Sequence, residues 1–214
     1  MPSDRPRSLV EIGLSVPLYN EEDLVCDVVA GMVDALEQTT THFRIALVNN
    51  GSTDSTGTLI DRLAGSDARL IPLHLAQNAG YGGGILAGIR ALQESHDPLM
   101  IGWAWGDGQI DAQVLVPQIA AIQAGARLAK THRTKRHDGL QRRIITQLYT
   151  WTTRVFGLRT PDVNGCPKLM DKDAYAALAP TSQDWFLDAE VVLGAEQQGW
   201  NIANIPTTMK RRAA

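Results

Sequence analysis

The sequence predicts an α/β domain with a mainly parallel central sheet. Short apolar segments of strand-like composition alternate with helical segments over the first 126 residues. Several expected strands run into turns rich in Asn, Asp, Gly and Ser, which is where open α/β sheets bind ligands. With 214 residues, 44% hydrophobic and 20% charged, the chain is long enough for one well-buried domain.

The first half predicts strands and helices in regular alternation. Asn20 is a suitable N-cap for a first helix, because acids follow it in the first turn and apolar residues then recur at helical spacing. The other expected helices cover 59–63, 85–94 and 114–123. The expected strands cover 10–17, 43–48, 69–75 and 99–105.

Beyond residue 126 the alternation loosens. We expect a long basic helix over about 140–156, helices over 173–178 and 185–198, and a last strand over 201–208. No linker, repeat or low-complexity segment divides the chain. The sequence therefore predicts one domain over 1–214.

Positive charge is concentrated in one third of a chain whose net charge is −3. This pattern favours an anionic partner, such as a phosphorylated ligand or a membrane surface, and nucleic acid is the weakest option because no aromatic stacking pattern accompanies it. Between 127 and 159 only Asp138 opposes the basic residues Arg127, Lys130, Arg133, Lys135, Arg136, Arg142, Arg143, Arg154 and Arg159.

We expect a cytoplasmic protein that touches the membrane, if at all, peripherally through region 127–159. The first seven residues are polar and lack the apolar core of a signal peptide. No segment has the roughly 20 apolar residues that cross a bilayer. Cys26 and Cys166 are far apart, which suggests neither a zinc site nor a disulfide framework.

Polar residues follow three of the expected strands, at 19–21, 49–54 and 105–109. Parallel strands bring such loops to one edge of a sheet, so these segments predict a binding cleft. The strand 99–105 ends at Gly106-Asp107-Gly108-Gln109, which places one carboxylate at that edge beside glycines that allow close approach of a ligand.

These segments resemble the motifs of family 2 glycosyltransferases with the GT-A fold, a Rossmann-like three-layer sandwich. In the first half they are 16–22 (VPLYNEE), 48–54 (VNNGSTD), 78–84 (NAGYGGG) and 105–109 (WGDGQ). In the second half they resemble the polyprenyl- and dolichyl-phosphate glycosyltransferase branch, at 162–169 (DVNGCPKL), 186–190 (FLDAE) and 205–206 (IP) with Arg211 or Arg212. Each motif is weak alone, but together and in order they cover about residues 9–212.

The resemblance implies a nucleotide-sugar site in residues 9–125 and an acceptor site in residues 126–214. Pro17, Tyr19 and Glu21 would line the base and ribose, with Asn50 beside them. Three cations of the second half are candidates for phosphate contacts. The full implied nucleotide-sugar set is Pro17, Tyr19, Glu21, Asn50, Ser52, Gly80, Gly82, Trp105, Gly106, Lys130, Arg133 and Lys168.

The resemblance also implies a metal ion and a catalytic carboxylate. Asp107, with help from Gln109, would hold Mg²⁺ or Mn²⁺ at the donor diphosphate, where oxygen ligands suit a hard cation. Asp188 would be the general base if the acceptor is a hydroxyl, and would position the acceptor or sugar if it is a lipid phosphate. For Glu190 a structural role and a functional role are both open.

The chain departs from the family pattern at two places. Both acids after the second strand are amides, Asn49 and Asn50, which lose the charge and gain donors. Trp105 stands in place of the first acid of the D-x-D motif, so we expect weaker metal binding at Asp107. An indole at this position could instead stack against a base or sugar.

The leading hypothesis is an inverting glycosyltransferase that moves a sugar from a nucleoside diphosphate sugar to a polyprenyl phosphate or a soluble biosynthetic intermediate. The lost acids motivate a second hypothesis, a catalytically inactive nucleotide-sugar-binding protein. A nucleotidyltransferase is the third, and the absence of a suitable glycine-rich start near the first strand argues against it.

Overall fold

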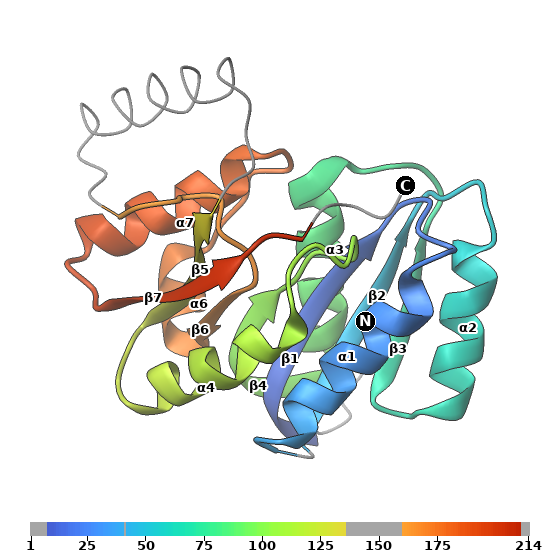
Figure 1. Ribbon diagram of the computed structural model, residues 1–214, viewed down its shortest axis with the longest axis horizontal. Helices are drawn as coiled ribbons and strands as arrows, with labels where there is room; N and C mark the ends of the chain where they lie inside the picture. Colours follow the sequence, from blue (N-terminus) through green and yellow to red (C-terminus); the bar gives the residue numbers. More distant parts are fainter. Residues whose placement is uncertain (1–7, 41, 136–159, 211–214) are drawn as a thin grey trace.

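The computed structural model describes residues 8–40, 42–135 and 160–210 (Figure 1). They form one seven-stranded sheet in the order β3-β2-β1-β4-β6-β5-β7. The strands are β1 (Ser8–Leu18), β2 (Phe43–Asn50), β3 (Leu70–Leu75), β4 (His96–Trp103), β5 (Leu128–Lys135), β6 (Lys168–Asp171) and β7 (Ile202–Thr208).

The sheet is mainly parallel, as the alternation of strands and helices predicts. β1 pairs in parallel with β2 and β4, and β2 pairs in parallel with β3. Only β6 runs antiparallel to its neighbours β4 and β5. In the register of β1, Leu18 lies opposite Asn49 and Ser15 opposite Trp103, so the ends of β1, β2 and β4 share one edge.

Helices cover both faces of the sheet, which confirms the expected three-layer α/β sandwich (Figure 1). One apolar core joins the sheet to α1, α2 and α4, and another joins it to α3, α6 and α7. The helices are α1 (Val25–Glu37), α2 (Thr56–Ser66), α3 (Gly80–Ser95), α4 (Leu115–Gln123) after the short η1 (Ala112–Val114), α6 (Lys172–Leu178) and α7 (Phe186–Gln197).

The glycines of helix α3 let it pack closely against the sheet. A Cβ at Gly88 would lie 2.2 Å from Ser15 Oγ and 2.8 Å from a methyl of Val48. The Ser15 hydroxyl donates to the Ile85 carbonyl over 3.0 Å, which joins β1 to the helix. Any side chain at position 88 would therefore push α3 away from β1 and β2.

Several element boundaries differ from those expected. Asn20 is not an N-cap, because it takes a left-handed conformation with φ of 54° and α1 begins only at Val25. The contacts between the loops after β1 and β2 select that conformation. Helix α3 starts at Gly80, five residues before the expected 85.

In the second half, β5 and β6 are not expected from the sequence, because the basic residues of β5 hide its strand pattern and β6 is only four residues long. The expected helix over 140–156 lies outside the described residues. The division of one domain into halves at residue 125 stays a prediction, although the sheet includes strands from both sides of it.

Candidate active site

Two loops at the edge of the sheet are joined by hydrogen bonds between short polar side chains and backbone. The Asn20 amide N–H donates to Ser52 Oγ over 3.1 Å, and the Thr53 N–H donates to Asn20 Oδ1 over 2.9 Å. The Glu21 N–H donates to Thr56 Oγ1 over 2.9 Å. The loops after β1 and β2 therefore form one polar surface, as expected.

The loop after β4 reaches the same edge. A Cβ at Gly106 would lie 2.3 Å from Leu18 Cδ2 and 3.1 Å from the Pro17 carbonyl oxygen, so glycine lets this loop pack closely on the end of β1. The next residue, Asp107, accepts the Gln109 N–H on Oδ1 over 3.0 Å, which shapes the turn that presents the carboxylate. The structure thus brings the three loops together and places Asp107 on the third.

Asn50 is committed to structure rather than left open to a ligand. Its Oδ1 accepts the Ala79 N–H over 2.9 Å, and its Nδ2 donates to the Gly80 carbonyl over 3.1 Å and to Asn78 Oδ1 over 3.3 Å. An aspartate could not make the two donor contacts. The amide therefore ties the end of β2 to the start of α3.

Asn49 is held in a comparable way on the other side of β2. Its Nδ2 lies 3.2 Å from His74 Nδ1, and its Oδ1 accepts the Ser52 N–H over 2.9 Å. His74 in turn contacts Asp61 through Nε2 over 2.9 Å. The two amides that replace the family's acids thus both fix loops.

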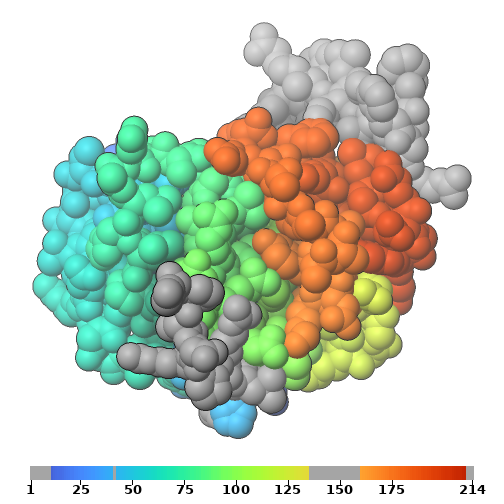
Figure 2. Space-filling model, turned by 180° about the vertical axis from the view of Figure 1, so that it is seen from behind, coloured from blue at the N-terminus to red at the C-terminus, as the bar shows by residue number. Residues whose placement is uncertain are grey.

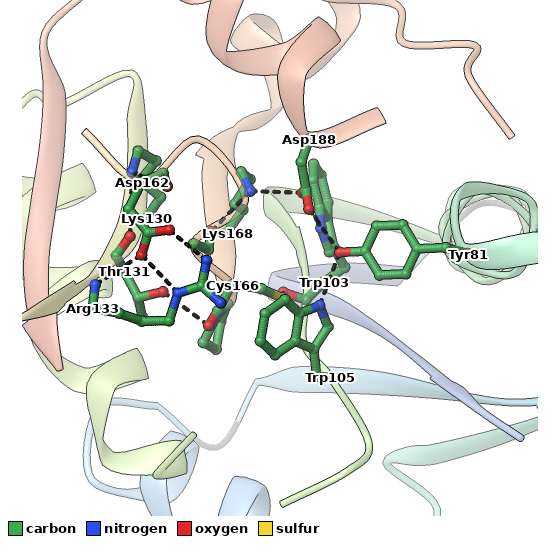
Figure 3. A network of polar contacts seen from close by, with 12 residues as sticks. Tyr81, Trp103, Trp105, Lys130, Thr131, Arg133, Asp162, Cys166, Lys168 and Asp188 are labelled. Atoms are coloured by element: carbon green, nitrogen blue, oxygen red, sulfur yellow. Dashed lines mark hydrogen bonds and ion pairs between the residues drawn. The ribbon is translucent and has the colours of Figure 1, made fainter. Parts of the chain in front are cut away.

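Asp188, at the start of α7, is fully buried and receives three donors (Figure 3). Its Oδ1 accepts from Lys168 Nζ over 2.6 Å and from Trp103 Nε1 over 3.3 Å. Its Oδ2 accepts from the Tyr81 hydroxyl over 3.0 Å. Lys168 is also fully buried, so this ion pair lies in a dry part of the molecule.

The Tyr81 hydroxyl joins this carboxylate to the end of β4. Trp105 Nε1 donates to the Tyr81 oxygen over 2.9 Å (Figure 3). Burial raises the pKa of Tyr81 well above its ordinary value, and the charge of Asp188 adds to the effect. Tyr81 therefore stays a neutral hydroxyl at physiological pH.

The three expected phosphate-binding cations have partners within the fold. Lys130 Nζ is buried and donates to the carbonyls of Thr131, Pro161 and Asp162. Burial first, and then the Lys168 cation, lower its pKa to about 7. These contacts favour a structural role for Lys130, and the ion pair with Asp188 does the same for Lys168.

Arg133 is held against the 161–168 segment. Its backbone N–H and its Nε both donate to Asp162 Oδ2 over 2.8 Å. The guanidinium also lies 5.6 Å from the centroid of the Trp105 ring. Its role at a phosphate stays a prediction.

The loop after β4 offers a small number of oxygen atoms that could coordinate a hard divalent cation. Among the residues that the structure describes, no three His, Cys, Asp or Glu side chains gather in a metal-binding group. Asp107 and the Gln109 amide offer oxygen ligands of the type that Mg²⁺ prefers. Mg²⁺ sites often combine one or two carboxylates with substrate phosphates, so these residues fit a cation shared with a diphosphate.

Two members of the Asp188 network, Tyr81 and Trp103, were not expected from the sequence. A usable signal existed for Trp103, because residues two apart on a strand point to the same face and Trp105 was already a candidate. Glu190 has a structural role, since its carboxylate accepts the N–H groups of Thr181 and Ser182. These donors lower the pKa of Glu190 although its burial acts to raise it.

The loop that Glu190 holds lies against the start of α3. The Gly83 N–H donates to the Gln183 carbonyl over 2.9 Å, and a Cβ at Gly82 would lie 2.3 Å from the Ser182 carbonyl oxygen. Seen from behind, the green surface around α3 lies beside the orange surface of the segment that leads into α7 (Figure 2). Gly80 and Gly82, expected at the nucleotide sugar, thus also serve this packing.

A mainly parallel sheet with three polar loops at one edge and helices on both faces is the architecture expected of a GT-A domain. The similarity to solved structures supports this fold. Glucosyl-3-phosphoglycerate synthase from Mycobacterium tuberculosis, in complex with Mn²⁺, UDP and glucosyl-3-phosphoglycerate, superposes with a TM-score of 0.68 at 14% identity. The match covers 96% of this chain and 72% of that chain.

The family model described as glycosyl transferase family 2 matches residues 14–178, and the chain belongs to this family. Glycosyltransferase AglD of Haloferax volcanii is 25% identical over 92% of this chain and 32% of its own length. A prophage bactoprenol glucosyl transferase homolog of Escherichia coli is 28% identical, over 77% of this chain and 53% of its own length. The chain therefore spans a third to a half of these two relatives.

A third relative matches over more of its length. Polyprenol monophosphomannose synthase of Mycolicibacterium smegmatis is 26% identical over 92% of this chain and 76% of its own length. Within the described ranges, none of the helices is both long and apolar enough to cross a membrane.

Proposed function

We propose that this chain transfers a sugar from a nucleoside diphosphate sugar to a polyprenyl phosphate, with inversion at the anomeric carbon. The observation that carries the proposal is the meeting of the three polar loops at Asp107, next to the buried Asp188 network. The two regions are joined through Trp105, two residues before Asp107. The polyprenol-related names of two relatives support the same acceptor class.

On the donor side, the loops after β1 and β2 would receive the nucleoside, and the loop after β4 the diphosphate. Asp107 and Gln109 would hold a divalent cation there. Mg²⁺ or Mn²⁺ supplies positive charge that stabilises the departing diphosphate. Tyr19 is 46% exposed at this edge and is therefore free to contact a base.

On the acceptor side, the state of Asp188 favours a phosphate nucleophile. A general base must reach the proton that it removes, yet this carboxylate is fully buried and both oxygens already accept hydrogen bonds. A phosphate oxygen is already anionic and needs no base. It would attack the anomeric carbon while the bond from that carbon to the diphosphate oxygen breaks.

We also propose that region 127–159 contacts the membrane, and this part of the proposal is based on the sequence alone. Residues 136–159 lie outside the described ranges. Arg127 pairs with Asp171 and Arg133 with Asp162, so these two described cations are engaged within the fold. A cytoplasmic location is likewise a prediction.

A second candidate function is the binding of a nucleotide sugar without transfer. It is favoured by Trp105 in place of an acid and by the structural engagement of Asn49 and Asn50. Membership of glycosyl transferase family 2 speaks against the third hypothesis, a nucleotidyltransferase.

The test is a transfer assay with a panel of nucleotide sugars and a short-chain polyprenyl phosphate, with and without EDTA. We expect product with at least one donor, and a loss of 100-fold or more for Asp107→Asn. The matched control is Asp173→Asn, an exposed acid on α6, which should keep wild-type turnover. Nucleotide-sugar binding without turnover for any donor would support the second candidate instead.

A further inference from the structure

We propose that Tyr81 is a positioning residue, whose hydroxyl fixes Trp105 and Asp188 relative to one another. This inference rests on the transfer proposed above. Tyr81 lies in the first turn of α3, with its oxygen 2.9 Å from Trp105 Nε1 and 3.0 Å from Asp188 Oδ2. It thus connects the end of β4 with the start of α7 (Figure 3).

The direction of each hydrogen bond follows from the chemistry of the partners. An indole nitrogen only donates, so the Tyr81 oxygen must accept from Trp105. The one hydroxyl proton then remains for Asp188, which accepts it. Lys168 and Trp103 are also donors only, so the Asp188 carboxylate accepts hydrogen bonds from three donors.

This polarity explains why an indole is tolerated where the family pattern has an acid. A carboxylate at position 105 could not donate to Tyr81. It would compete with Asp188 for the single hydroxyl proton and add a second negative charge. The hydrogen bonds therefore run in one direction, from the Trp105 indole to the Tyr81 oxygen and from the Tyr81 hydroxyl to the Asp188 carboxylate.

The surroundings of Tyr81 hold it rigidly in this position. Asn50 fixes the two residues that precede it, through the Ala79 N–H and the Gly80 carbonyl. The Tyr81 ring stacks on Trp185, with centroids 4.2 Å apart and planes at 8°. The hydroxyl is thus aimed by contacts from β2 and from the segment before α7.

The consequence for the site lies in the loop after β4. Trp105 is its second residue and Asp107 its fourth, so the bond from Trp105 to Tyr81 fixes the first part of this loop. On the other side, Tyr81 supplies the only donor to Asp188 Oδ2 among the hydrogen bonds of the described residues. Loss of the Tyr81 hydroxyl would therefore weaken the hold on both the loop after β4 and the Asp188 carboxylate.

Tyr81→Phe tests the inference, because it keeps the stacked ring and removes only the hydroxyl. We expect kcat for sugar transfer to fall about tenfold or more, as for the loss of hydrogen bonds to a charged group, with a smaller change in the KM of the donor. Trp105→Phe, which removes the N–H, should lower kcat less. The double variant should resemble Tyr81→Phe alone, because the two residues act as one unit. Tyr175→Phe on α6 is the matched control and should leave kcat unchanged.

A second readout does not depend on activity. In ¹H–¹⁵N spectra, Tyr81→Phe should shift the indole N–H signal of Trp105, assigned through Trp105→Phe, and Tyr175→Phe should not. An unshifted Trp105 signal, or unchanged kcat in Tyr81→Phe, overturns the inference. If wild-type protein transfers no sugar while the Trp105 signal does shift, the proposed function has failed and the hydrogen-bonded chain has not.

Discussion

The two halves of the candidate site are built in opposite ways. At the sheet edge, the loops after β1 and β2 are held by short polar side chains that bond to backbone groups near solvent, such as Asn20 with Ser52 and Thr53. Around Asp188, a charged pair lies in a dry interior and every contact comes from a side chain of another element.

Because of this difference, we expect the two regions to have different roles in the site. The polar edge offers exposed side chains and backbone groups to a ligand. The removal of one contact there should lower the free energy of unfolding only slightly. The Asp188 network is charged and buried, so the removal of one partner leaves an uncompensated group. We therefore expect the edge to govern donor binding and the network to govern the integrity of the site.

The largest effect is expected from the buried ion pair. Lys168→Met removes the cation beside Asp188 and should lower the free energy of unfolding by about 3 to 5 kcal/mol. Lys172→Met is the matched control, since its pair with Asp97 has side chains 41% and 46% exposed. That variant should change the free energy of unfolding by less than about 1 kcal/mol in urea denaturation. Equal effects would remove the contrast between dry and wet regions.

A smaller effect is expected at Asn50, which ties the end of β2 to the start of α3. Asn50→Asp keeps the shape but turns a donor toward the Gly80 carbonyl into an acceptor. We expect a loss of about 1 to 3 kcal/mol in the free energy of unfolding. Asn49→Asp should cost less, because the contact between Asn49 and His74 lies at an exposed position. A larger loss for Asn49→Asp would contradict the linking role of Asn50.

The pH dependence of the free energy of unfolding tests whether burial lowers the pKa of Lys130. Its pKa is lowered to about 7 in the fold, against an ordinary value of 10.5. Between pH 7 and 10 the unfolded chain thus holds a proton that the folded chain releases. The free energy of unfolding should rise by about 1 kcal/mol per pH unit over this range, and the rise should be absent in Lys130→Met. An equal rise in both proteins would show that the three carbonyl contacts keep Lys130 charged.

The smallest effect is expected at the open edge. Ser52→Ala removes the acceptor of the Asn20 N–H at an exposed position, which should cost about 0.5 to 1 kcal/mol in the free energy of unfolding. Because the loop still has the contact between Asn20 and Thr53, we expect only a few-fold increase in the KM of the donor. A loss as large as that of Lys168→Met would mean that the edge is as tightly coupled as the network.

The same contrast governs what the sequence could predict. The strands, the helices and the convergence of the polar loops follow from local patterns and from the geometry of parallel sheets. The start of α1 was misplaced, because contacts between loops hold Asn20 in a left-handed conformation that no local pattern reveals. Strands β5 and β6 are not predicted, since the buried lysine of each resembles a surface charge in the sequence.

The Asp188 network lies beyond such patterns. Its members come from positions 81, 103, 105, 168 and 188, and only the folded chain brings them together. Lys168 was singled out by its motif but assigned to phosphate, because sequence gives a lysine no indication of its burial. Tyr81 lies in the glycine-rich segment 78–84, where the sequence points to the glycines Gly80 and Gly82 as the residues at the ligand.

Both oxygens of the Asp188 carboxylate already accept hydrogen bonds, and we propose that the acceptor therefore brings its own negative charge. The most direct measurement compares a polyprenyl phosphate with the polyprenol of the same chain length as acceptors for the same nucleotide sugar. We predict sugar transfer to the phosphate and none to the alcohol. Transfer to the alcohol at a comparable kcat/KM would contradict the account.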